Sequence, residues 1–259
     1  MTSTMERNKK KTDTLAFCLG ILLVGALIQT AGWLKNDRLV FPDVGEILAA
    51  FVRLLGTGKV WKQIGTTLLH LLEALALSSV IGTALGLVQG RSPFVRTLLR
   101  PLMILLRSIP MIVMTVIIMV LLRYDRVPLV ASAMMLVPLI SEATCEGFLR
   151  SEPEMIDVYR MNSGFSARVL FQVYLPLMAG YLKQAYVNAV GMGIKLAVTT
   201  EYLVQARDSL GKAVYSSAYF NEYAEIYAYA LIMILLALAV SAAPKWIGRA
   251  AEAYKKSHP

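Results

Sequence analysis

Several ionisable side chains lie inside long apolar stretches of this sequence, and their spacing indicates which of them could act together. His70 and Glu73 are three residues apart and Glu142 and Glu146 are four apart, so each pair would share one face of a helix. Glu73 would lie about 18 Å along such a helix from Trp61. Because an ionised group is costly within a lipid bilayer, each pair predicts either a polar pathway or an internal partner.

Arg107 lies in the next apolar stretch, at a depth similar to that of Glu142. One interpretation is an ion pair between Arg107 and Glu142 that holds two helices together, and the other is a role for both in lining a pathway. An ionised Glu73 on a pathway would repel an anion, which favours a neutral or cationic solute. Burial of Glu73, or compensation by His70, would remove that preference.

Three further charged residues lie toward the ends of a later apolar stretch. Lys183 and Lys195 are within about two turns of its ends, so both can extend their charged groups to the membrane interface. Glu201 falls at the outer end, where a hydrated position at the mouth of a pathway is one interpretation. The candidate pathway residues are therefore His70, Glu73, Arg107, Glu142 and Glu201.

No recognisable catalytic motif accompanies these residues. The sequence contains no Walker A pattern, no HExxH or CxxC spacing, and no nucleophile paired with a base in a known motif. Cys18 and Cys145 both lie in apolar runs, where a thiol is typically a small buried hydrophobe. We therefore expect no catalytic site, no metal and no cofactor, and we expect that this chain does not hydrolyse ATP itself.

The composition sets the class of protein that must position these residues. Of the 259 residues, 57% are hydrophobic and only 17% are charged, which is more apolar surface than a soluble domain can hide. The formal net charge is +9, but the basic residues lie between apolar runs and do not form a stripe with interleaved aromatics. This distribution is typical of membrane topology signals and argues against binding of nucleic acid.

A bilayer core requires about 20 apolar residues in a helix, because a helix satisfies its own backbone polar groups. We therefore predict an all-α, polytopic membrane helical bundle. The third predicted span begins at Pro101 and contains Pro110, which predicts a bend or an interruption, and Pro138 predicts a kink in the fourth. The six predicted spans are 15–33, 61–88, 101–122, 127–149, 177–200 and 223–243.

Lys and Arg residues outside these spans are more numerous on the side that holds the N-terminus, which predicts that both termini are cytoplasmic. The basic N-terminus followed by an apolar run resembles a signal peptide, but the run is long enough to span and lacks a clear cleavage site, so we expect a retained first helix. Residues 42–55, with Ile47, Leu48 and Leu55 at helical spacing, predict an amphipathic helix at the outer membrane surface. The expected organisation is one transmembrane domain, residues 1–259, with a tail 1–14, a six-helix core 15–243 and a tail 244–259.

The segment 150–176 is too polar at its start to lie in lipid. Pro153 can begin a helix, Glu154 and Asp157 suit its first turn, and Ser163 with Gly164 would end it. A second short helix, 167–174, would follow at the cytoplasmic face. A solvated connecting loop is the alternative interpretation of the same pattern.

The same segment resembles the EAAxxxG(x9)IxLP loop of binding-protein-dependent ABC importer permeases. The matching residues are Asp157-Val158-Tyr159, Ser163 and Val173-Tyr174-Leu175-Pro176, and the spacing fits throughout. Asp replaces the family's Glu, Val-Tyr replaces its alanine pair, and Ser163 takes its glycine position.

The resemblance extends over most of the chain, to the permeases of nitrate, sulfonate, taurine and thiamine-precursor importers. Leu106-Arg107-Ser108-Ile109-Pro110 is similar to their LRxIP segment, and Ser151-Glu152-Pro153-Glu154-Met155-Ile156-Asp157 to their SVDPELLE approach to the loop. Thr200-Glu201-Tyr202 followed by Ser209-Leu210-Gly211 is similar to their AE…GLG run. The chain departs from the group at Leu122-Arg123-Tyr124, where WFG is usual.

This resemblance implies that 150–176 forms a coupling helix, which docks on a cytoplasmic ATPase subunit and transmits its closure to the membrane helices. It implies charged contacts, an apolar docking face and a tight turn from Glu154, Asp157, Tyr159, Arg160, Met161, Ser163, Gly164, Phe165 and Pro176. The implied partners are cytoplasmic ABC ATPase subunits, an extracytoplasmic substrate-binding protein and a second copy of the chain.

The implied solute is a small organic nutrient, such as a vitamin precursor of the thiamine-precursor type, or a small anion such as nitrate, a sulfonate or taurine. A secondary transporter not powered by ATP is the alternative function. Such a transporter would more typically carry many more spans or an inverted repeat. An intramembrane enzyme would need the catalytic constellation that the sequence lacks.

Overall fold

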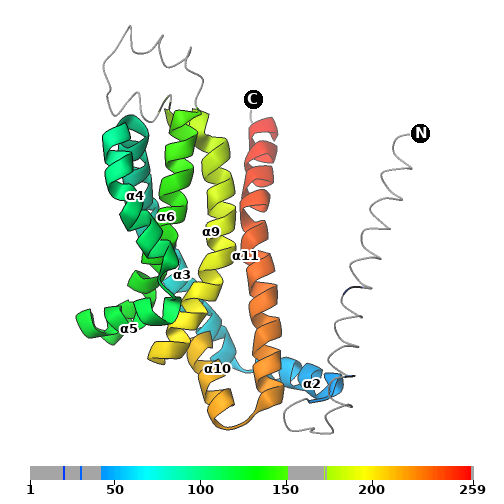
Figure 1. The fold of residues 1–259 in the computed structure, drawn as a ribbon. Coiled ribbons are helices and arrows are strands. Elements are labelled where there is room, and N and C mark those ends of the chain that lie inside the picture. Colours follow the sequence, from blue (N-terminus) through cyan, green and yellow to red (C-terminus); the bar gives the residue numbers. More distant parts are fainter. Residues whose placement is uncertain (1–19, 21–29, 31–41, 151–171, 173, 258–259) are drawn as a thin grey trace. The chain divides into compact units, whose positions relative to one another are not determined.

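The computed structural model describes residues 42–150 and 174–257, together with residues 20, 30 and 172, and every regular element within this part of the chain is a helix. The predicted first span, 15–33, lies outside the described residues except at positions 20 and 30. The elements are α2 (Val44–Leu55), α3 (Gly58–Arg91), α4 (Pro93–Ser108), α5 (Met111–Leu121), the short 3-10 helix η1 (Tyr124–Arg126), α6 (Val127–Leu149), α9 (Leu175–Val204), α10 (Leu210–Tyr219) and α11 (Tyr223–Ser257) (Figure 1). The all-α prediction is confirmed.

The chain divides into two compact units, one made of Met1–Gly58 with Ser216–Ile232 and the other of Lys59–Tyr215 with Met233–Pro259. In the first unit, Glu225 accepts a hydrogen bond from Arg53 at 3.0 Å and another from Ser217 at 3.1 Å. The predicted helix over 42–55 forms as α2, and its buried positions include Ile47 and Leu54. Leu48, which we assigned to the same apolar face, is exposed.

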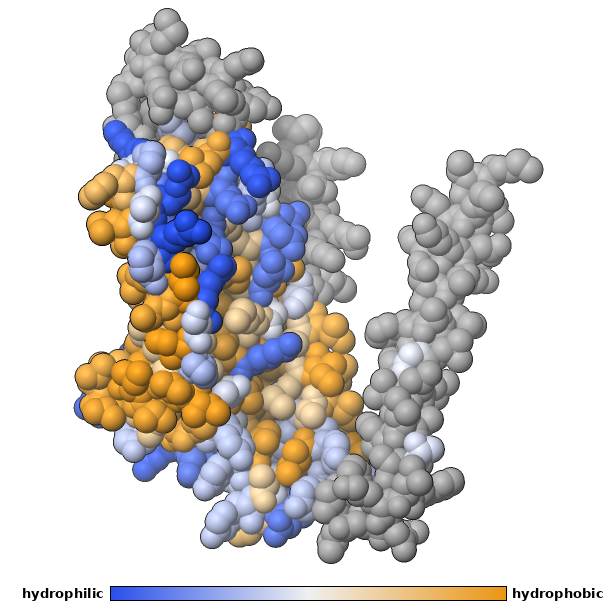
Figure 2. Space-filling model, viewed as in Figure 1, coloured by the Kyte–Doolittle hydropathy of each residue, from blue (hydrophilic) through white to orange (hydrophobic). Residues whose placement is uncertain are grey.

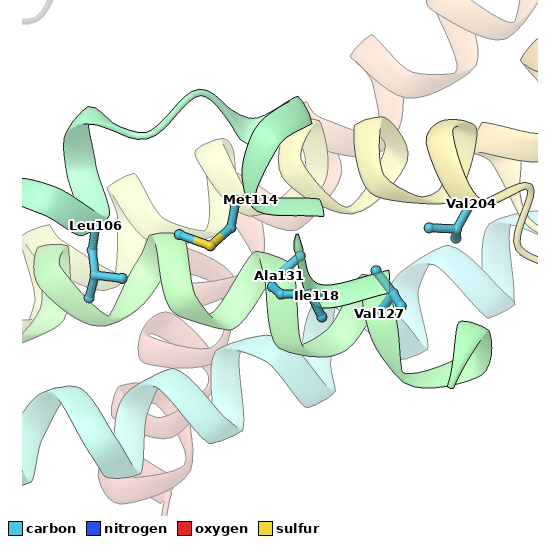
Figure 3. Close-up of a cluster of buried hydrophobic side chains, with 6 residues drawn as sticks. All are labelled: Leu106, Met114, Ile118, Val127, Ala131 and Val204. Carbon is cyan, nitrogen blue, oxygen red and sulfur yellow. The ribbon is translucent and has the colours of Figure 1, made fainter. Parts of the chain in front are cut away.

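The second unit contains the helices that carry the candidate site residues. α6 packs most extensively on α9, and its side chains are buried along most of its length. Leu106, Met114, Ile118, Val127, Ala131 and Val204 form one apolar cluster among α4, α5, α6 and the end of α9 (Figure 3). A second buried cluster joins Leu136 of α6 to Ala189 and Leu196 of α9. α6 is therefore the central helix of this unit.

Three glycines of α3 allow that helix to approach α6 closely. A Cβ on Gly82 would lie 2.9 Å from the Ile140 Cβ, and one on Gly90 would lie 2.8 Å from the Phe148 Cβ. Gly86, between them, faces the Ser141 carbonyl oxygen and Thr144. Small residues repeated every four positions let two backbones pack closely, so this stripe serves helix packing.

The third predicted span is broken at Pro110, as the sequence indicated. α4 and α5 meet at 103° across Ile109 and Pro110, which Figure 1 shows as a sharp corner. Ile109 has ψ of 123°, an extended conformation that the following proline favours. α4 begins at Pro93, eight residues before the predicted start of the span, and it continues through Pro101. Ser92 caps this helix, and its Oγ accepts from the Val95 N–H at 3.4 Å.

Three helical segments, Gly58–Arg91, Tyr124–Leu149 and Tyr223–Ser241, are long and apolar enough to cross a membrane, and the bent pair α4–α5 makes up to four such spans within the described residues. α6 occupies the predicted span 127–149 and continues as a helix through Pro138. α9 covers the predicted span 177–200 as one helix, but it is not among these apolar spans. The reason is its polar side chains, which have a specific arrangement described below.

Gly86→Ala is expected to destabilise the chain by roughly 1–3 kcal/mol, because overpacking of a close helix contact has costs of that order. The new Cβ would clash with the Ser141 carbonyl oxygen and lie 2.5 Å from the Thr144 Cβ. Thermal unfolding of the purified chain in detergent measures the effect. The matched control is Gly65→Ala on the same helix, where nothing lies within 4 Å of the added Cβ. Equal melting temperatures for the two variants would contradict the packing role.

Candidate functional site

A stripe of polar side chains runs along one exposed face of α9. Gln184, Asn188, Lys195 and Thr199 are exposed and recur at spacings of four, seven and four residues, which places them on one side of a helix. Gln184 donates to the Asn188 side chain at 3.2 Å. The opposite face is buried through Ala189 and other small or apolar residues. A polar face on a long helix of a membrane bundle requires contact with water or with polar protein.

Charged side chains of α4 and α6 continue this polar surface. Arg107 and Glu142 form an ion pair with 2.6 Å between guanidinium nitrogen and carboxylate oxygen, and both side chains are half-exposed. Beside this pair, a cavity of about 580 Å³ is lined by Arg96 and Arg100 of α4 and by Glu142 and Glu146 of α6. Figure 2 shows hydrophilic surface gathered over α4, α6 and α9 between apolar areas. The predicted Arg107–Glu142 pair therefore forms, and it lies on a polar face.

Glu201, near the end of α9, is fully buried. Its Oε2 accepts hydrogen bonds from the Thr67 hydroxyl at 2.8 Å and from the Gly211 backbone N–H at 3.2 Å. Its Oε1 lies 2.7 Å from Nδ1 of His70. Thr67 in turn accepts from the Leu210 backbone N–H at 3.1 Å. Burial of a carboxyl group is tolerated when such partners replace water, and this group has three.

The turn after α9 brings these donors to Glu201. Gln205 adopts a left-handed conformation with φ of 52°, which ends α9 and turns the chain back. Gly211 then approaches α9 so closely that a Cβ there would lie 2.5 Å from the Glu201 Cβ and from the Tyr202 nitrogen. Only glycine fits at this contact, so the Ser209-Leu210-Gly211 run has a direct structural role.

The five candidate pathway residues thus separate into three locations. His70 and Glu201 meet in the buried network, and Arg107 and Glu142 meet at the polar face. The hydrated position that the sequence allowed for Glu201 does not occur, because donors from α3 and α10 surround its carboxyl group. Glu73 is exposed near the middle of α3, and His70 is paired with Glu201 and not with Glu73.

An exposed ion pair lies at the end of the bundle, away from the middle of the helices. It joins Lys62 to Asp208, with 2.7 Å between Nζ and the carboxylate oxygen. The hydrogen bond from Lys62, together with its charge, lowers the pKa of Asp208 below the ordinary value for an aspartate. Solvent screens a pair this exposed, so its effect on folding is small. The pair links the start of α3 to the loop that follows α9.

Most of the predicted coupling segment lies outside the described residues, including Glu154, Asp157, Tyr159, Arg160, Met161, Ser163, Gly164 and Phe165. Pro176, its last member, is the second residue of α9, where the lack of a backbone N–H is tolerated. Phe148 at the end of α6 stacks on Tyr174, with ring centroids 4.9 Å apart. The two helices that flank the segment are thus held together where it leaves and re-enters the bundle.

Several functional candidates were not identified from the sequence. Thr67 is three residues before His70 and on the same helix face, a spacing that could have signalled a shared partner. The α9 stripe is not apparent from the sequence, because Lys183 and Lys195 can each be explained singly as interfacial lysines. Gln89 donates to Ser141 at 2.8 Å in a buried α3–α6 contact that no sequence pattern indicates. Within the described ranges, no group of three or more His, Cys, Asp or Glu side chains is placed to hold a metal ion.

Residues 78–253, more than half of the chain, match the model of a family described as binding-protein-dependent transport system inner membrane component. Among solved structures, the chain is similar in fold to a chain of the MetNI methionine ABC transporter in inward-facing conformations, with a TM-score of 0.61 and 17% sequence identity. That match covers 78% of this chain and 96% of the other. A comparison with curated proteins gives no match.

Exchanging the charges of Arg107 and Glu142 tests their pair. Arg107→Glu and Glu142→Arg each place like charges together, so each is expected to reduce the yield of monodisperse protein and its melting temperature. The double exchange should restore most of the loss. Size-exclusion chromatography and thermal unfolding provide the measurement. Arg100→Glu combined with Glu142→Arg is the control, because Arg100 lines the same cavity without forming this ion pair. Rescue by that combination, or no rescue by the true exchange, would argue against the pair.

Proposed function

Since this chain belongs to the family of binding-protein-dependent transport system inner membrane components and is a multi-pass permease of an ABC importer, we propose that the polar face of α4, α6 and α9 lines its translocation pathway. We propose further that residues 150–176 couple this pathway to ATP hydrolysis on a separate subunit. The α9 stripe is the observation that carries the first proposal.

Lipid cannot satisfy the groups that α9 exposes. An amide or ammonium group in hydrocarbon loses hydrogen bonds to water, at a cost of several kcal/mol for each unsatisfied group. Asn188 lies near the middle of the 30-residue helix α9, so extension to the membrane interface cannot relieve all of the stripe. A water-filled passage along this face satisfies every one of these groups, and the half-exposed Arg107–Glu142 pair on α4 and α6 benefits in the same way.

Glu73 belongs to the same proposal on separate grounds. Its side chain is exposed near the middle of the apolar helix α3, among exposed apolar residues such as Leu69 and Leu72. A carboxylate at that depth favours a position next to water or to another polar surface. We assign Glu73 to the pathway of the assembled transporter.

The charges along the proposed pathway include both signs, with Glu142 and Glu146 opposite Arg96 and Arg100. A face with both signs suits a small polar solute, because it can compensate either charge on the solute. The candidate solutes are a small organic nutrient, such as a precursor of the thiamine type, and a small anion such as nitrate, a sulfonate or taurine. Glu73 is exposed and His70 pairs with Glu201, so Glu73 favours a neutral or cationic nutrient over the anion. Selection among them is assigned to an extracytoplasmic binding protein.

Residues 150–176 connect α6 to α9, the two helices that pack most extensively on each other. A segment that moved with a bound ATPase subunit would therefore act directly on the ends of both helices. In this arrangement the termini and the segment face the cytoplasm, two ATPase subunits bind there, and a second copy of the chain completes the pathway. The Phe148–Tyr174 stack supports rigid transmission at the base of the segment.

Cysteine labelling distinguishes a water-filled pathway from lipid. In a background without Cys18 and Cys145, Asn188→Cys and Thr199→Cys are expected to react with a membrane-impermeant thiol reagent, because water reaches their face of α9. Ala189→Cys, one residue from the stripe but fully buried, is the matched control and should stay unreactive. Reaction rates in proteoliposomes give the readout. If all three cysteines were equally protected from the thiol reagent, the pathway assignment would be wrong.

Two substitutions in the coupling segment test its connection to ATP hydrolysis. Gly164→Pro should remove the predicted turn, and Asp157→Arg should reverse a predicted contact charge, so both should leave the chain in the membrane but reduce transport. Both should also reduce co-purification of the ATPase subunit. Membrane fractionation gives the control for insertion. Normal transport and normal ATPase association in both variants would contradict this assignment while leaving the α9 pathway untouched.

A further inference from the structure

A cavity of about 710 Å³ lies in the second unit at the end of α9, and the proposed function does not use it. It is lined by His70 of α3, by Arg123, Tyr124 and Asp125 between α5 and α6, by Val204 at the end of α9, and by Gln205, Ala206 and Arg207 after it. The sequence departs from the importer permeases at Leu122-Arg123-Tyr124. The structure places Arg123 and Tyr124 of that departure on the wall of this cavity.

The electrostatic balance of the cavity is positive. Asp125 lies 3.5 Å from Nε of Arg123 and 3.8 Å from Nε of Arg126, so its negative charge is shared with an arginine outside the cavity and offsets Arg123 only in part. Arg207 adds a second positive charge without a carboxylate partner among the described residues. The end of α9 directs carbonyl groups toward this region and the start of α6 directs N–H groups toward it, so the two helix dipoles oppose one another. The sign of the electrostatic potential in the cavity is therefore set by the arginines.

His70 gives the cavity a positioned hydrogen-bond donor or acceptor. Its side chain is largely buried, and Nδ1 faces the fully buried carboxyl group of Glu201 at 2.7 Å. That contact fixes the ring and leaves Nε2 as the nitrogen available to a bound group. The Glu201 carboxylate orients the His70 ring through one nitrogen. Thr67 and Gly211 hold that carboxylate in place in turn, so the orientation of His70 is fixed by the fold.

The backbone that carries Arg207 is also specialised. Gln205 has φ of 52° and Asp208 has φ of 54°, and both are residues for which a left-handed conformation is less favourable than for glycine. The Ala206 N–H donates to the Glu201 carbonyl at 3.0 Å, which fixes the first turn of the loop. Lys62 holds Asp208 from the other side at 2.7 Å. Arg207 therefore extends from a loop that is fixed at both ends.

From this geometry we propose that the cavity binds an oxyanion group, a sulfate, sulfonate, phosphate or carboxylate, between Arg207, Arg123 and Nε2 of His70. Arginine presents several N–H donors in a plane that suits such oxygens, and its hydrogen bonds to them are charge-assisted. The source of the oxyanion is either a small solute in the surrounding water or a phospholipid headgroup. The site rests on contacts within this chain, so it does not depend on the proposed transport pathway or on coupling to ATP hydrolysis.

The two histidines of the chain make a direct binding test practical. Full-length protein labelled with ¹⁵N-histidine is placed in phosphatidylcholine nanodiscs, and the His70 signal is assigned by comparison with His258→Gln. Sodium sulfate is then added, with sodium chloride at the same ionic strength as the reference, because screening alone must be excluded. The expected result is a saturable shift of the His70 Nε2 signal that chloride does not produce.

Arg207→Gln is expected to weaken sulfate binding about tenfold or more, as loss of a charge-assisted hydrogen bond does. Arg123→Gln is a second variant with the same expectation, in case one of them unfolds, and thermal unfolding verifies both. Lys59→Gln is the matched control, since it removes an exposed positive charge at the start of α3 that does not line the cavity. It should keep the affinity for sulfate within about twofold of the unmodified chain.

Nanodiscs of phosphatidylglycerol without sulfate form the second arm. A sulfate response in phosphatidylcholine supports a solute as the source. A response to phosphatidylglycerol alone, lost in Arg207→Gln, supports an oxyanion site filled by a headgroup. The proposal would be overturned if neither arm shifted the Nε2 signal, or if Lys59→Gln abolished the effect as fully as Arg207→Gln does. None of these outcomes depends on transport. A negative result for oxyanion binding would therefore leave the conclusion from cysteine labelling unchanged.

Discussion

The carboxyl group of Glu201 has no contact with solvent, and the elements around it supply its hydrogen-bond partners. Thr67 and His70 reach it from α3, and the Gly211 N–H reaches it from the start of α10. Loss of one of these partners would leave a buried polar atom unsatisfied, which costs about 1–3 kcal/mol. The contact therefore fixes the position of α9 against α3 and also fixes the return of the chain after α9.

Glycine residues make close backbone contacts possible at two places in the structure. Along α3, Gly82, Gly86 and Gly90 bring that helix against α6, and at α10 Gly211 brings a backbone N–H within reach of Glu201. In lipid the hydrophobic effect does little to draw helices together, so packing of small residues and internal hydrogen bonds carry the association. With α3, α6 and α9 positioned in this way, the polar side chains of α4, α6 and α9 gather on one face of the unit.

The bundle thus separates its polar groups into three kinds of environment. Glu201 is buried and fully satisfied, and it has a structural role. Arg107, Glu142 and the α9 stripe are exposed along the helices, where water must reach them in a membrane protein. Arg123 and Arg207 surround a cavity at the end of α9 that is linked to the buried network through His70. One histidine therefore contacts both the interior support and the exposed cavity.

The membrane class, the helical fold, the helix over 127–149, the break at Pro110 and the resemblance to importer permeases all follow from the sequence alone. Those features depend on hydropathy over about 20 residues, on the missing N–H of proline and on local motifs, all of which are properties of contiguous sequence. The sequence also proposed the Arg107–Glu142 pair, because two charges at equal depth in neighbouring spans have few other partners. It could not decide that His70 pairs with Glu201 and not with Glu73, since 131 residues separate the partners that meet. Only the packing of α3 on α9, and the turn at Gln205 that returns Gly211 to Glu201, decided which ionisable groups are buried and which face water.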